Sequence, residues 1–234
     1  MKEKTDQKKH FGYHTHRNIA LHRFKAIYFY IPKVACSSIK TVVSDLLQIE
    51  PPNPKRPLAF IHERDYPFVE RDEVLTKYKE YFKFCFVRNP WDRVVSCYFN
   101  KISTDEGLTN RSFKNGVAVT LLKHGDLFWG GMTFPDFARA VCRVPDDRAD
   151  VHFRSQCKFV TCQEGTLLVD FIGRFENLEA DFSIVCDKMG IENIRLPHLF
   201  KSERLHYRHY YDKSLQEEVE ERYREDIKMF GYEF

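Results

Sequence analysis

A lysine and two serines lie close together in the segment 33–38, which reads Lys-Val-Ala-Cys-Ser-Ser. An apolar run precedes the segment and a helix-like pattern follows it, as where a strand runs directly into a helix. The first amides of such a helix are unpaired and, with the helix dipole, attract an anion such as phosphate. The small residues would let oxygens approach the backbone, and the serines and the lysine would bind them. We therefore predict an anion site, with an ordinary turn and a surface lysine as the alternative.

The order of residues in this turn differs from that of nucleoside triphosphatases. Their motif, G-x-x-x-x-G-K-[ST], places the lysine at the end of the turn and a magnesium-binding hydroxyl directly after it. Here Lys33 comes first, after Pro32, and the turn contains no glycine. The order argues against a triphosphatase.

A second candidate anion site combines Arg88, at the end of an apolar run, with Ser96, eight residues later. An arginine at the carboxyl edge of a strand points into the crevice where α/β sheets bind ligands. Its guanidinium can hold a phosphate through two hydrogen bonds. The alternative is an arginine at a helix entry that pairs with Asp92, and for this segment alone that alternative is favoured.

The elements that must position these residues alternate between strands and helices. Continuous apolar runs predict buried strands at 26–31, 81–87 and 167–172. Apolar residues at helical spacing predict helices from Ser38 to before residue 51, after Pro90, over 134–144, from Asn177 to Gly190, and from a capping box at Ser214. This alternation predicts an α/β fold with a mostly parallel sheet flanked by helices.

Length and charge set limits on the organisation and the partners. In a chain of 234 residues we expect a polar, flexible or surface segment at 1–24 and one domain at 25–234, with an insertion or lid at 103–150. The net charge of +3 is too small to indicate nucleic acid as the main partner. No apolar run approaches the roughly 18–20 residues that span a membrane. Without an export signal, the seven cysteines indicate reduced thiols and a cytosolic protein, or a Golgi lumen if a membrane anchor has been lost.

Together the two anion motifs resemble those of sulfotransferases. Segment 31–40 is similar to their 5′-phosphosulfate loop, and segment 86–98 is similar to their 3′-phosphate motif. The variant is nearest to carbohydrate sulfotransferases of the chondroitin 4-O and HNK-1 type. Segments 170–178 and 207–212 resemble downstream parts of that family, whereas 103–150 matches nothing in it. The resemblance covers the chain from about residue 26 onward, and it implies a P-loop-like three-layer fold.

The resemblance also implies a reaction, in which 3′-phosphoadenosine 5′-phosphosulfate (PAPS) gives its sulfuryl group in line to an acceptor hydroxyl on a carbohydrate. It implies no metal, because protein cations neutralise the charge. Lys33 would stabilise the leaving oxygen. The implied donor-binding residues are Lys33, Ala35, Cys36, Ser37 and Ser38 for the 5′ end, and Arg88 and Ser96 for the 3′-phosphate.

A base must take the proton of the acceptor hydroxyl. The first candidate is His62, since related enzymes carry a histidine in a similar place, and its neighbour Glu63 is the second. A solvated loop histidine is the alternative for His62. His152 is a further candidate, as an acceptor-site residue.

For three other groups of residues the sequence favours a functional role less strongly. His152, Cys157 and Cys162 are spaced too loosely to indicate zinc. Trp129 with Phe128 would suit an acceptor platform, and ordinary packing is the default for such residues. Arg174 and Glu176 would suit an ion pair near the nucleotide, for which a structural role is favoured.

Two rival functions remain open at this point. The first is a P-loop kinase or nucleotide hydrolase, which would bind ATP with magnesium. The second is a nucleotide-binding module that binds adenosine 3′,5′-bisphosphate (PAP) without turnover.

Overall fold

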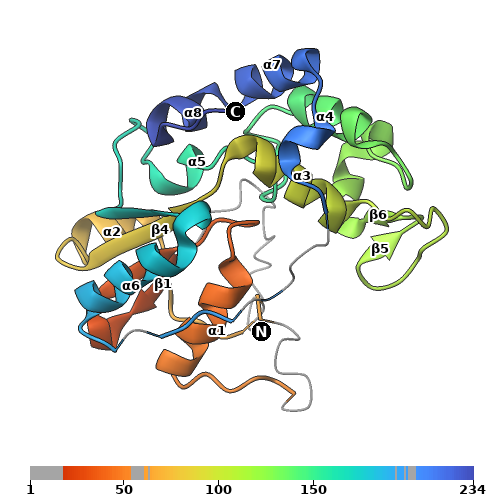
Figure 1. Ribbon diagram of the computed structural model, residues 1–234. Coiled ribbons are helices and arrows are strands. Elements are labelled where there is room, and N and C mark those ends of the chain that lie inside the picture. Colours follow the sequence, from red (N-terminus) through yellow and green to blue (C-terminus); the bar gives the residue numbers. More distant parts are fainter. Residues whose placement is uncertain (1–17, 54–60, 63, 193, 198, 200–203) are drawn as a thin grey trace, which may run out of the picture.

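The computed structural model describes residues 18–53, 61–62, 64–192, 194–197, 199 and 204–234 (Figure 1). Its main sheet has the order β3-β1-β2-β4-β7, with two parallel pairs (β2–β4 and β4–β7) and two antiparallel pairs (β1–β2 and β1–β3). The sheet is therefore mixed, and the expected parallel part is confirmed only for three adjacent strands. The strands are β1 (Asn18–Leu21), β2 (Ala26–Phe29), β3 (Phe68–Val69), β4 (Phe82–Val87) and β7 (Phe171–Arg174).

The strand β1 corrects the expectation for the segment 1–24. Residues 1–17 lie outside the described part of the chain, but Asn18–Leu21 are fully buried between β2 and β3. A 3-10 turn (η1, His22–Phe24) then leads into β2. The polar residues around this four-residue strand concealed it, and its reversed direction makes the sheet mixed.

The third predicted strand lies later than expected, at Phe171–Arg174 in place of 167–172. Leu168 instead donates its amide to the Val160 carbonyl, and its side chain is buried in a loop. Gly173 explains why the strand runs where it does. A Cβ at Gly173 would lie 2.4 Å from the ring of Phe86, so only glycine lets β7 approach β4 here.

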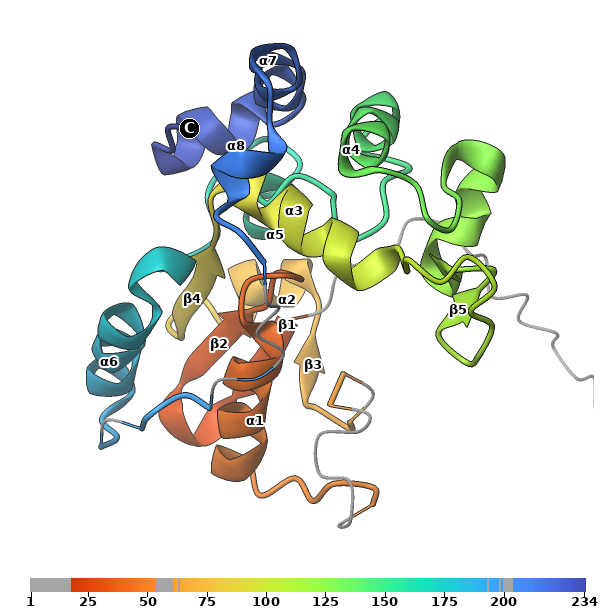
Figure 2. The ribbon, with the colours of Figure 1, turned by 45° about the vertical axis from the view of Figure 1, so that its right-hand side comes forward.

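The helices lie against the sheet and beyond the end where β4 runs into α3 (Figures 1 and 2). Both views place α3, α4, α5, α7 and α8 together at that end, and α6 packs on β4 and β7. The α-helices are α1 (Cys36–Leu46), α2 (Arg71–Thr76), α3 (Pro90–Lys101), α4 (Phe134–Arg143), α5 (Cys157–Val160), α6 (Leu178–Met189), α7 (Lys213–Arg222) and α8 (Arg224–Phe230).

The predicted ends of the helices are confirmed at some positions and wrong at others. Pro90 opens α3, where the Asn89 side chain accepts from the first amides, and Gly190 ends α6 in the left-handed conformation. Asn177 precedes α6 but makes no side-chain cap. The capping box expected at Ser214 is wrong, because α7 begins earlier, capped by Asp212.

The segment 103–150 is built into the domain. It contains a small hairpin, β5 (Phe113–Lys114) with β6 (Val117–Ala118), the 3-10 segment η2 (Val119–Leu127) and α4. Tyr98 on α3 donates its hydroxyl to the Met132 carbonyl at 2.9 Å, and Leu121 and Phe137 are fully buried. An apolar core thus joins this segment to α3.

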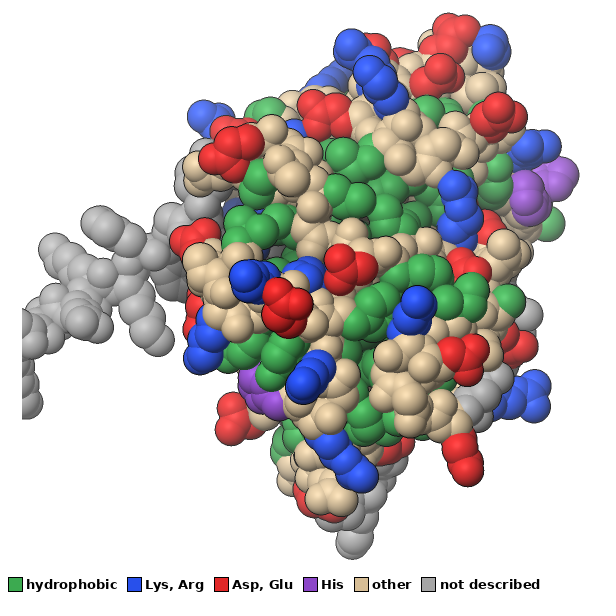
Figure 3. All heavy atoms as spheres, turned by 90° about the vertical axis from the view of Figure 1, so that its left-hand side faces the viewer, with side chains coloured by type: hydrophobic (Ala, Val, Ile, Leu, Met, Phe, Trp, Pro, Cys, Tyr) green, Lys and Arg blue, Asp and Glu red, His purple; other side chains and the backbone are tan. Residues whose placement is uncertain are grey.

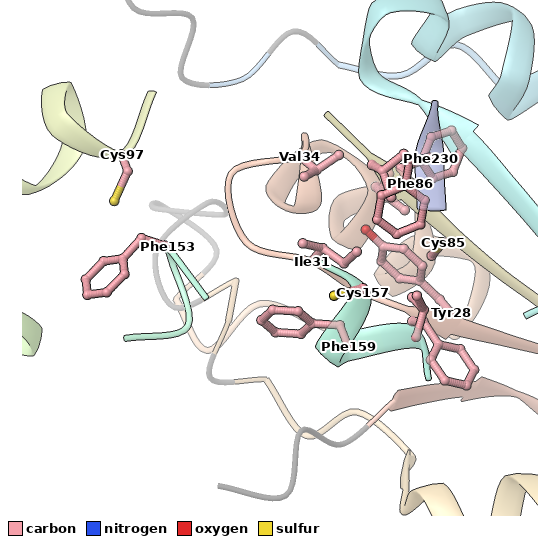
Figure 4. Packing of buried hydrophobic residues seen from close by; sticks show 14 of the residues in the cluster. Tyr28, Ile31, Val34, Cys85, Phe86, Cys97, Phe153, Cys157, Phe159 and Phe230 are labelled. Atoms are coloured by element: carbon pink, nitrogen blue, oxygen red, sulfur yellow. The ribbon is translucent and has the colours of Figure 1, made fainter. Parts of the chain in front are cut away.

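The core continues under the predicted anion turn. Ile31 and Val34 of the turn lie beside Tyr28, Cys85 and Phe86 (Figure 4). On the surface, basic and acidic side chains are interspersed over the face in Figure 3, in keeping with the small net charge. The turn is therefore anchored by buried apolar residues on both sides of Lys33.

Candidate functional site

The turn between β2 and α1 holds Lys33 and Ala35 in the left-handed backbone region, with φ of 71° and 49°. This region costs a non-glycine residue roughly 1–2 kcal/mol, and such strain concentrates at functional sites. Ala35 precedes α1 and supplies no side-chain cap. The first amides of α1 therefore face the turn without a capping side chain, which is the arrangement an anion site needs. The helix begins at Cys36, two residues earlier than its apolar pattern indicated.

Cations gather around Lys33. Burial, with the charges of Lys101 and Arg88, lowers the pKa of Lys33 to about 8, against the opposing effect of the Cys97 and Cys36 thiols. Lys101 comes from the last turn of α3 and is itself only 7% exposed. Positive charges packed together away from water are stabilised when an anion binds between them.

Arg88 joins the two motifs directly. One terminal nitrogen of its guanidinium donates to the backbone carbonyl of Lys33 at 3.0 Å, across 55 residues of sequence. Its Nε and its other terminal nitrogen each lie 2.8 Å from Asp92. The ring of Phe175 lies 3.9 Å from the guanidinium carbon. Arg88 thus contacts the turn, and the pairing with Asp92 that was the alternative for this segment is present as well.

The carboxylate of Asp92 is shared by two arginines. Its second oxygen lies 2.5 Å from a terminal nitrogen of Arg204, a residue that sequence reasoning did not single out. Ser96 lies four residues beyond Asp92 on α3, and is half-buried. Residues four apart are neighbours on a helix face. Within the described residues, however, Ser96 and Arg88 are not brought into hydrogen-bond contact.

His62 contacts the anion turn through both ring nitrogens. Its Nε2 lies 3.1 Å from Ser37 Oγ, and its Nδ1 lies 3.4 Å from Lys40 Nζ. Lys40 is only 1% exposed and its ammonium lies 3.6 Å from the Tyr30 ring centroid. Although His62 is exposed overall, its nitrogens face inward, where burial and then the Lys40 charge lower its pKa well below the ordinary value.

His152 forms a buried pair with Asp150. Its Nδ1 lies 2.5 Å from Asp150 Oδ1, which also accepts the His152 amide at 3.0 Å. Burial alone would raise the pKa of Asp150, but the hydrogen bond from His152 holds it at about 2. The charges of Lys101 and Lys33 act on His152, and that of His152 acts on His62. The two histidines and the two lysines therefore occupy one region.

Two polar side chains hold the segment that carries His152 against the anion turn. Arg93, 2% exposed, donates to the Pro32 carbonyl at 3.1 Å and to the Val151 and Arg154 carbonyls at 3.2 and 2.7 Å. Gln156 exchanges two hydrogen bonds with the backbone of Arg88, at 2.9 and 2.8 Å. These contacts hold the His152 segment beside the turn. No local sequence pattern indicates them.

The C-terminal helices support the same segment from behind. Asp226 on α8 is fully buried and accepts the amides of Gln156 and Cys157 at 2.7 and 2.8 Å. The Tyr223 hydroxyl donates to the Phe153 carbonyl at 2.6 Å. The end of the chain therefore contributes to the position of His152.

The other residues singled out from the sequence have mixed outcomes. Glu63 lies outside the described residues. Ser38 is 5% exposed and Trp129 is 48% exposed. Glu176 accepts from the Asn89 amide and the Tyr232 hydroxyl, so it supports the entry to α3, as the structural reading expected. All seven cysteines are free, and no group of three or more potential metal ligands is assembled within the described part of the chain.

Besides Arg204, sequence reasoning missed five residues that the structure places at the site: Lys40, Arg93, Lys101, Asp150 and Gln156. Lys40 and Lys101 had a signal, because each occurs on the buried face of an amphipathic helix where a charge is unexpected. The other three act through partners about 60 residues away or more, or through a pairing that composition does not reveal.

Among the described residues, no helix combines the length and the apolar character required to cross a bilayer. This finding concerns the described helices alone.

Comparison with known proteins finds a matching family model and related sequences over most of the chain. Residues 17–233 match the family model described as "Sulfotransferase family". Carbohydrate sulfotransferase 14 of Danio rerio is 29% identical over 229 residues, which cover 90% of this chain and 60% of that protein. The human protein of the same name is 30% identical over 227 residues, covering 90% and 58%. Carbohydrate sulfotransferase 11 of Mus musculus is 28% identical over 200 residues, covering 76% and 54%.

The chain thus spans about 60% of the length of the first two curated relatives. No solved structure gives a significant match.

Proposed function

The chain belongs to the sulfotransferase family, and on that premise we propose that it transfers the sulfuryl group of PAPS to a hydroxyl of a carbohydrate acceptor. The kinase alternative is not favoured, because the relatives are carbohydrate sulfotransferases and the turn lacks the triphosphatase order. We further propose the P-loop-like three-layer fold that the family implies, with the β2–turn–α1 unit as its anion-binding part.

One observation carries the proposal: the uncapped start of α1 faces a cluster of cations. Lys33 is half-buried beside Lys101 and Arg88, and two of the three turn residues before α1 have left-handed backbone angles. Such a site fits a multiply charged anion, which would relieve the repulsion and pair with the amides. The donor supplies an activated sulfuryl group and carries phosphate groups at both ends, so it would extend from this turn toward Arg88.

The residues of the turn have distinct tasks in this proposal. The amides from Cys36 to Ser38 and the Ser37 hydroxyl would hold the 5′ end, with Ala35 leaving room at the backbone. Ser37 suits this task because its Oγ lies 3.1 Å from His62 Nε2, a contact that holds the hydroxyl beside the turn. Lys33 would follow the charge that develops on the leaving oxygen.

Arg88 and Ser96 are proposed to bind the 3′-phosphate. Arg88 has five N–H groups, of which its contacts with Lys33 and Asp92 use three. The remaining two N–H groups are available to a phosphate oxygen. Asp92 would then orient the guanidinium and partly neutralise it, and Arg204 would hold the second oxygen of that carboxylate.

Our proposals for the acceptor and for the cellular compartment are based on the related proteins. A carbohydrate acceptor is proposed because the relatives are carbohydrate sulfotransferases. The cytosolic prediction finds no support in these relatives, and the Golgi lumen is the compartment that we propose. No resident metal is proposed, since cationic side chains supply the charge at the turn.

The experiment that tests the proposed donor is a thermal shift with PAP compared with ATP and magnesium. We expect PAP at 100 times its Kd to stabilise the protein by about 2.7 kcal/mol, and ATP with magnesium to stabilise it far less. The non-catalytic alternative would give the same shift but no sulfuryl transfer from PAPS. Stabilisation by ATP and magnesium alone would overturn the proposal.

A further inference from the structure

His62 is poorly arranged to accept a proton. Lys40 has a pKa of about 8, lowered from its ordinary value by burial, so at neutral pH it is an ammonium group that can only donate. His62 Nδ1, 3.4 Å from that ammonium, must therefore be the acceptor. The proton of the neutral ring then lies on Nε2, which donates to Ser37 Oγ. Neither nitrogen keeps a free lone pair for an acceptor hydroxyl.

His152 has the opposite arrangement. The Asp150 carboxylate accepts the Nδ1 proton, so the lone pair lies on Nε2. Among the described residues no hydrogen bond to this Nε2 is found, and the side chain is 25% exposed, so Nε2 keeps its lone pair for a hydroxyl. A carboxylate, an oriented imidazole and a free Nε2 form the combination that general bases use.

The His152 ring is held in place by contacts on both sides of it in the sequence. Arg93 binds the Val151 and Arg154 carbonyls together with that of Pro32, the residue before Lys33. Asp150 is only 5% exposed, so its carboxylate cannot turn away into solvent. Arg93 therefore joins the backbone on both sides of His152 to the anion turn.

We propose that His152, oriented by Asp150, is the residue that takes the proton of the acceptor hydroxyl, and that His62 instead serves the donor site by holding Ser37. The inference rests on the proposed sulfuryl transfer and specifies its acceptor side.

The step balances in atoms and charge. A bond forms between the acceptor oxygen and the sulfur, and the bond between the sulfur and the 5′-phosphate oxygen breaks with its electron pair left on that oxygen. The hydroxyl proton passes to His152 Nε2, and the resulting imidazolium is paired with Asp150. PAP and the sulfated acceptor are the products.

The charge state of the site suits this role at neutral pH. Burial first, and then the charge of Lys101, lower the pKa of His152, while the bond to Asp150 opposes them. Lys33 and His62 also interact electrostatically with the His152 ring. The ring is thus neutral at pH 7, and its activity should fall only as the pH drops below the ordinary range for histidine.

The kinetic test compares three variants with labelled PAPS and desulfated chondroitin. His152→Ala should lower kcat by about 10²–10⁴-fold, with added imidazole restoring part of it, and should leave the Kd of PAP within about threefold. Asp150→Asn should lower kcat as well, without imidazole rescue, and move the acid limb of the pH profile. The matched control is His22→Ala, an exposed histidine beside Tyr81 at the far end of β4, which should keep wild-type turnover. Full turnover in His152→Ala would overturn the inference, whereas an inactive wild type that binds PAP would count against the proposed function.

A second measurement needs no acceptor. Nitrogen NMR of the histidine rings at pH 7, assigned through His152→Ala and His62→Ala, reports which nitrogen carries the proton. We expect the Nδ1–H form for His152 and the Nε2–H form for His62, and we expect Asp150→Asn to change only the former. The reverse pair of tautomers would contradict the proposed roles.

Discussion

Replacing Arg93 by lysine tests how the site is assembled. The guanidinium donates to the Pro32 carbonyl, 61 residues before it, and to the Val151 and Arg154 carbonyls, 58 and 61 residues after it. A lysine ammonium at the same place would reach one of the three. Two hydrogen bonds would be lost. At about 1–1.5 kcal/mol each, the loss amounts to about 2–3 kcal/mol in the free energy of unfolding. For a chain of this size the melting temperature should fall by roughly 4–12 °C.

Turnover should fall more than stability alone explains. Arg93 holds the His152 segment to the turn, and a displacement of about 1 Å at a reacting group can cost 10²-fold in rate. We expect kcat of Arg93→Lys, measured well below its melting temperature, to fall at least tenfold while PAP affinity stays within about threefold.

The matched control is Arg139→Lys. Arg139 is 38% exposed and pairs with Glu218 at 3.2 Å, and exposed pairs of this kind contribute about 0–1 kcal/mol. Urea unfolding of both variants gives the comparison. If Arg93→Lys loses no more stability than Arg139→Lys and keeps its kcat, Arg93 does not organise the site.

Three further predictions concern charge and helix ends. Burial, Lys101 and Arg88 place the pKa of Lys33 near 8, so kcat/KM should decline as the pH rises through about 8 and Lys33 loses its charge. Lys33→Ala should lower kcat more than it lowers PAP affinity. The control is Lys40→Met, because Lys40 also has a pKa of about 8. This variant should still lose kcat/KM as the pH rises through about 8. Arg88→Ala should weaken PAP binding at least tenfold by calorimetry, and unchanged binding would remove Arg88 from the donor site. Asp212→Ala should cost about 1 kcal/mol in urea unfolding because it removes the cap of α7, with no change in PAP binding.

The strand–turn–helix units at both motifs could be predicted because their signals are local. Apolar runs end at Pro32 and before Arg88, and helical periodicity begins directly afterward. The β2–α1 and β4–α3 units accordingly appear in the structure, with Pro90 at the start of α3. Parallel pairing of β2 and β4 then brings Lys33 and Arg88 to one edge.

The remaining features depend on contacts that no local pattern carries. The strand β1 is four residues long, follows a polar segment and gains its burial from β2 and β3 on either side. Asp212 rather than Ser214 caps α7, so the cap lies two residues earlier than predicted.

The same reason explains the gap in the site prediction. The family resemblance drew attention to His62, whereas the hydrogen bonds of its ring depend on the buried Lys40. His152 is held beside the turn by Arg93 and Gln156, whose partners lie about 60 residues away or more. Long-range hydrogen bonds to backbone carbonyls leave no periodic signal in a sequence.

The proposed activity is tested by following labelled sulfur from PAPS into a carbohydrate. The purified chain is incubated with sulfur-labelled PAPS and a set of desulfated glycosaminoglycans, and the label is followed into the polysaccharide and matched to the PAP released. We predict equal amounts of labelled polysaccharide and PAP from the wild type, and neither from Lys33→Ala at the same protein concentration. PAP binding without label in any carbohydrate, or equal transfer by Lys33→Ala, would contradict it.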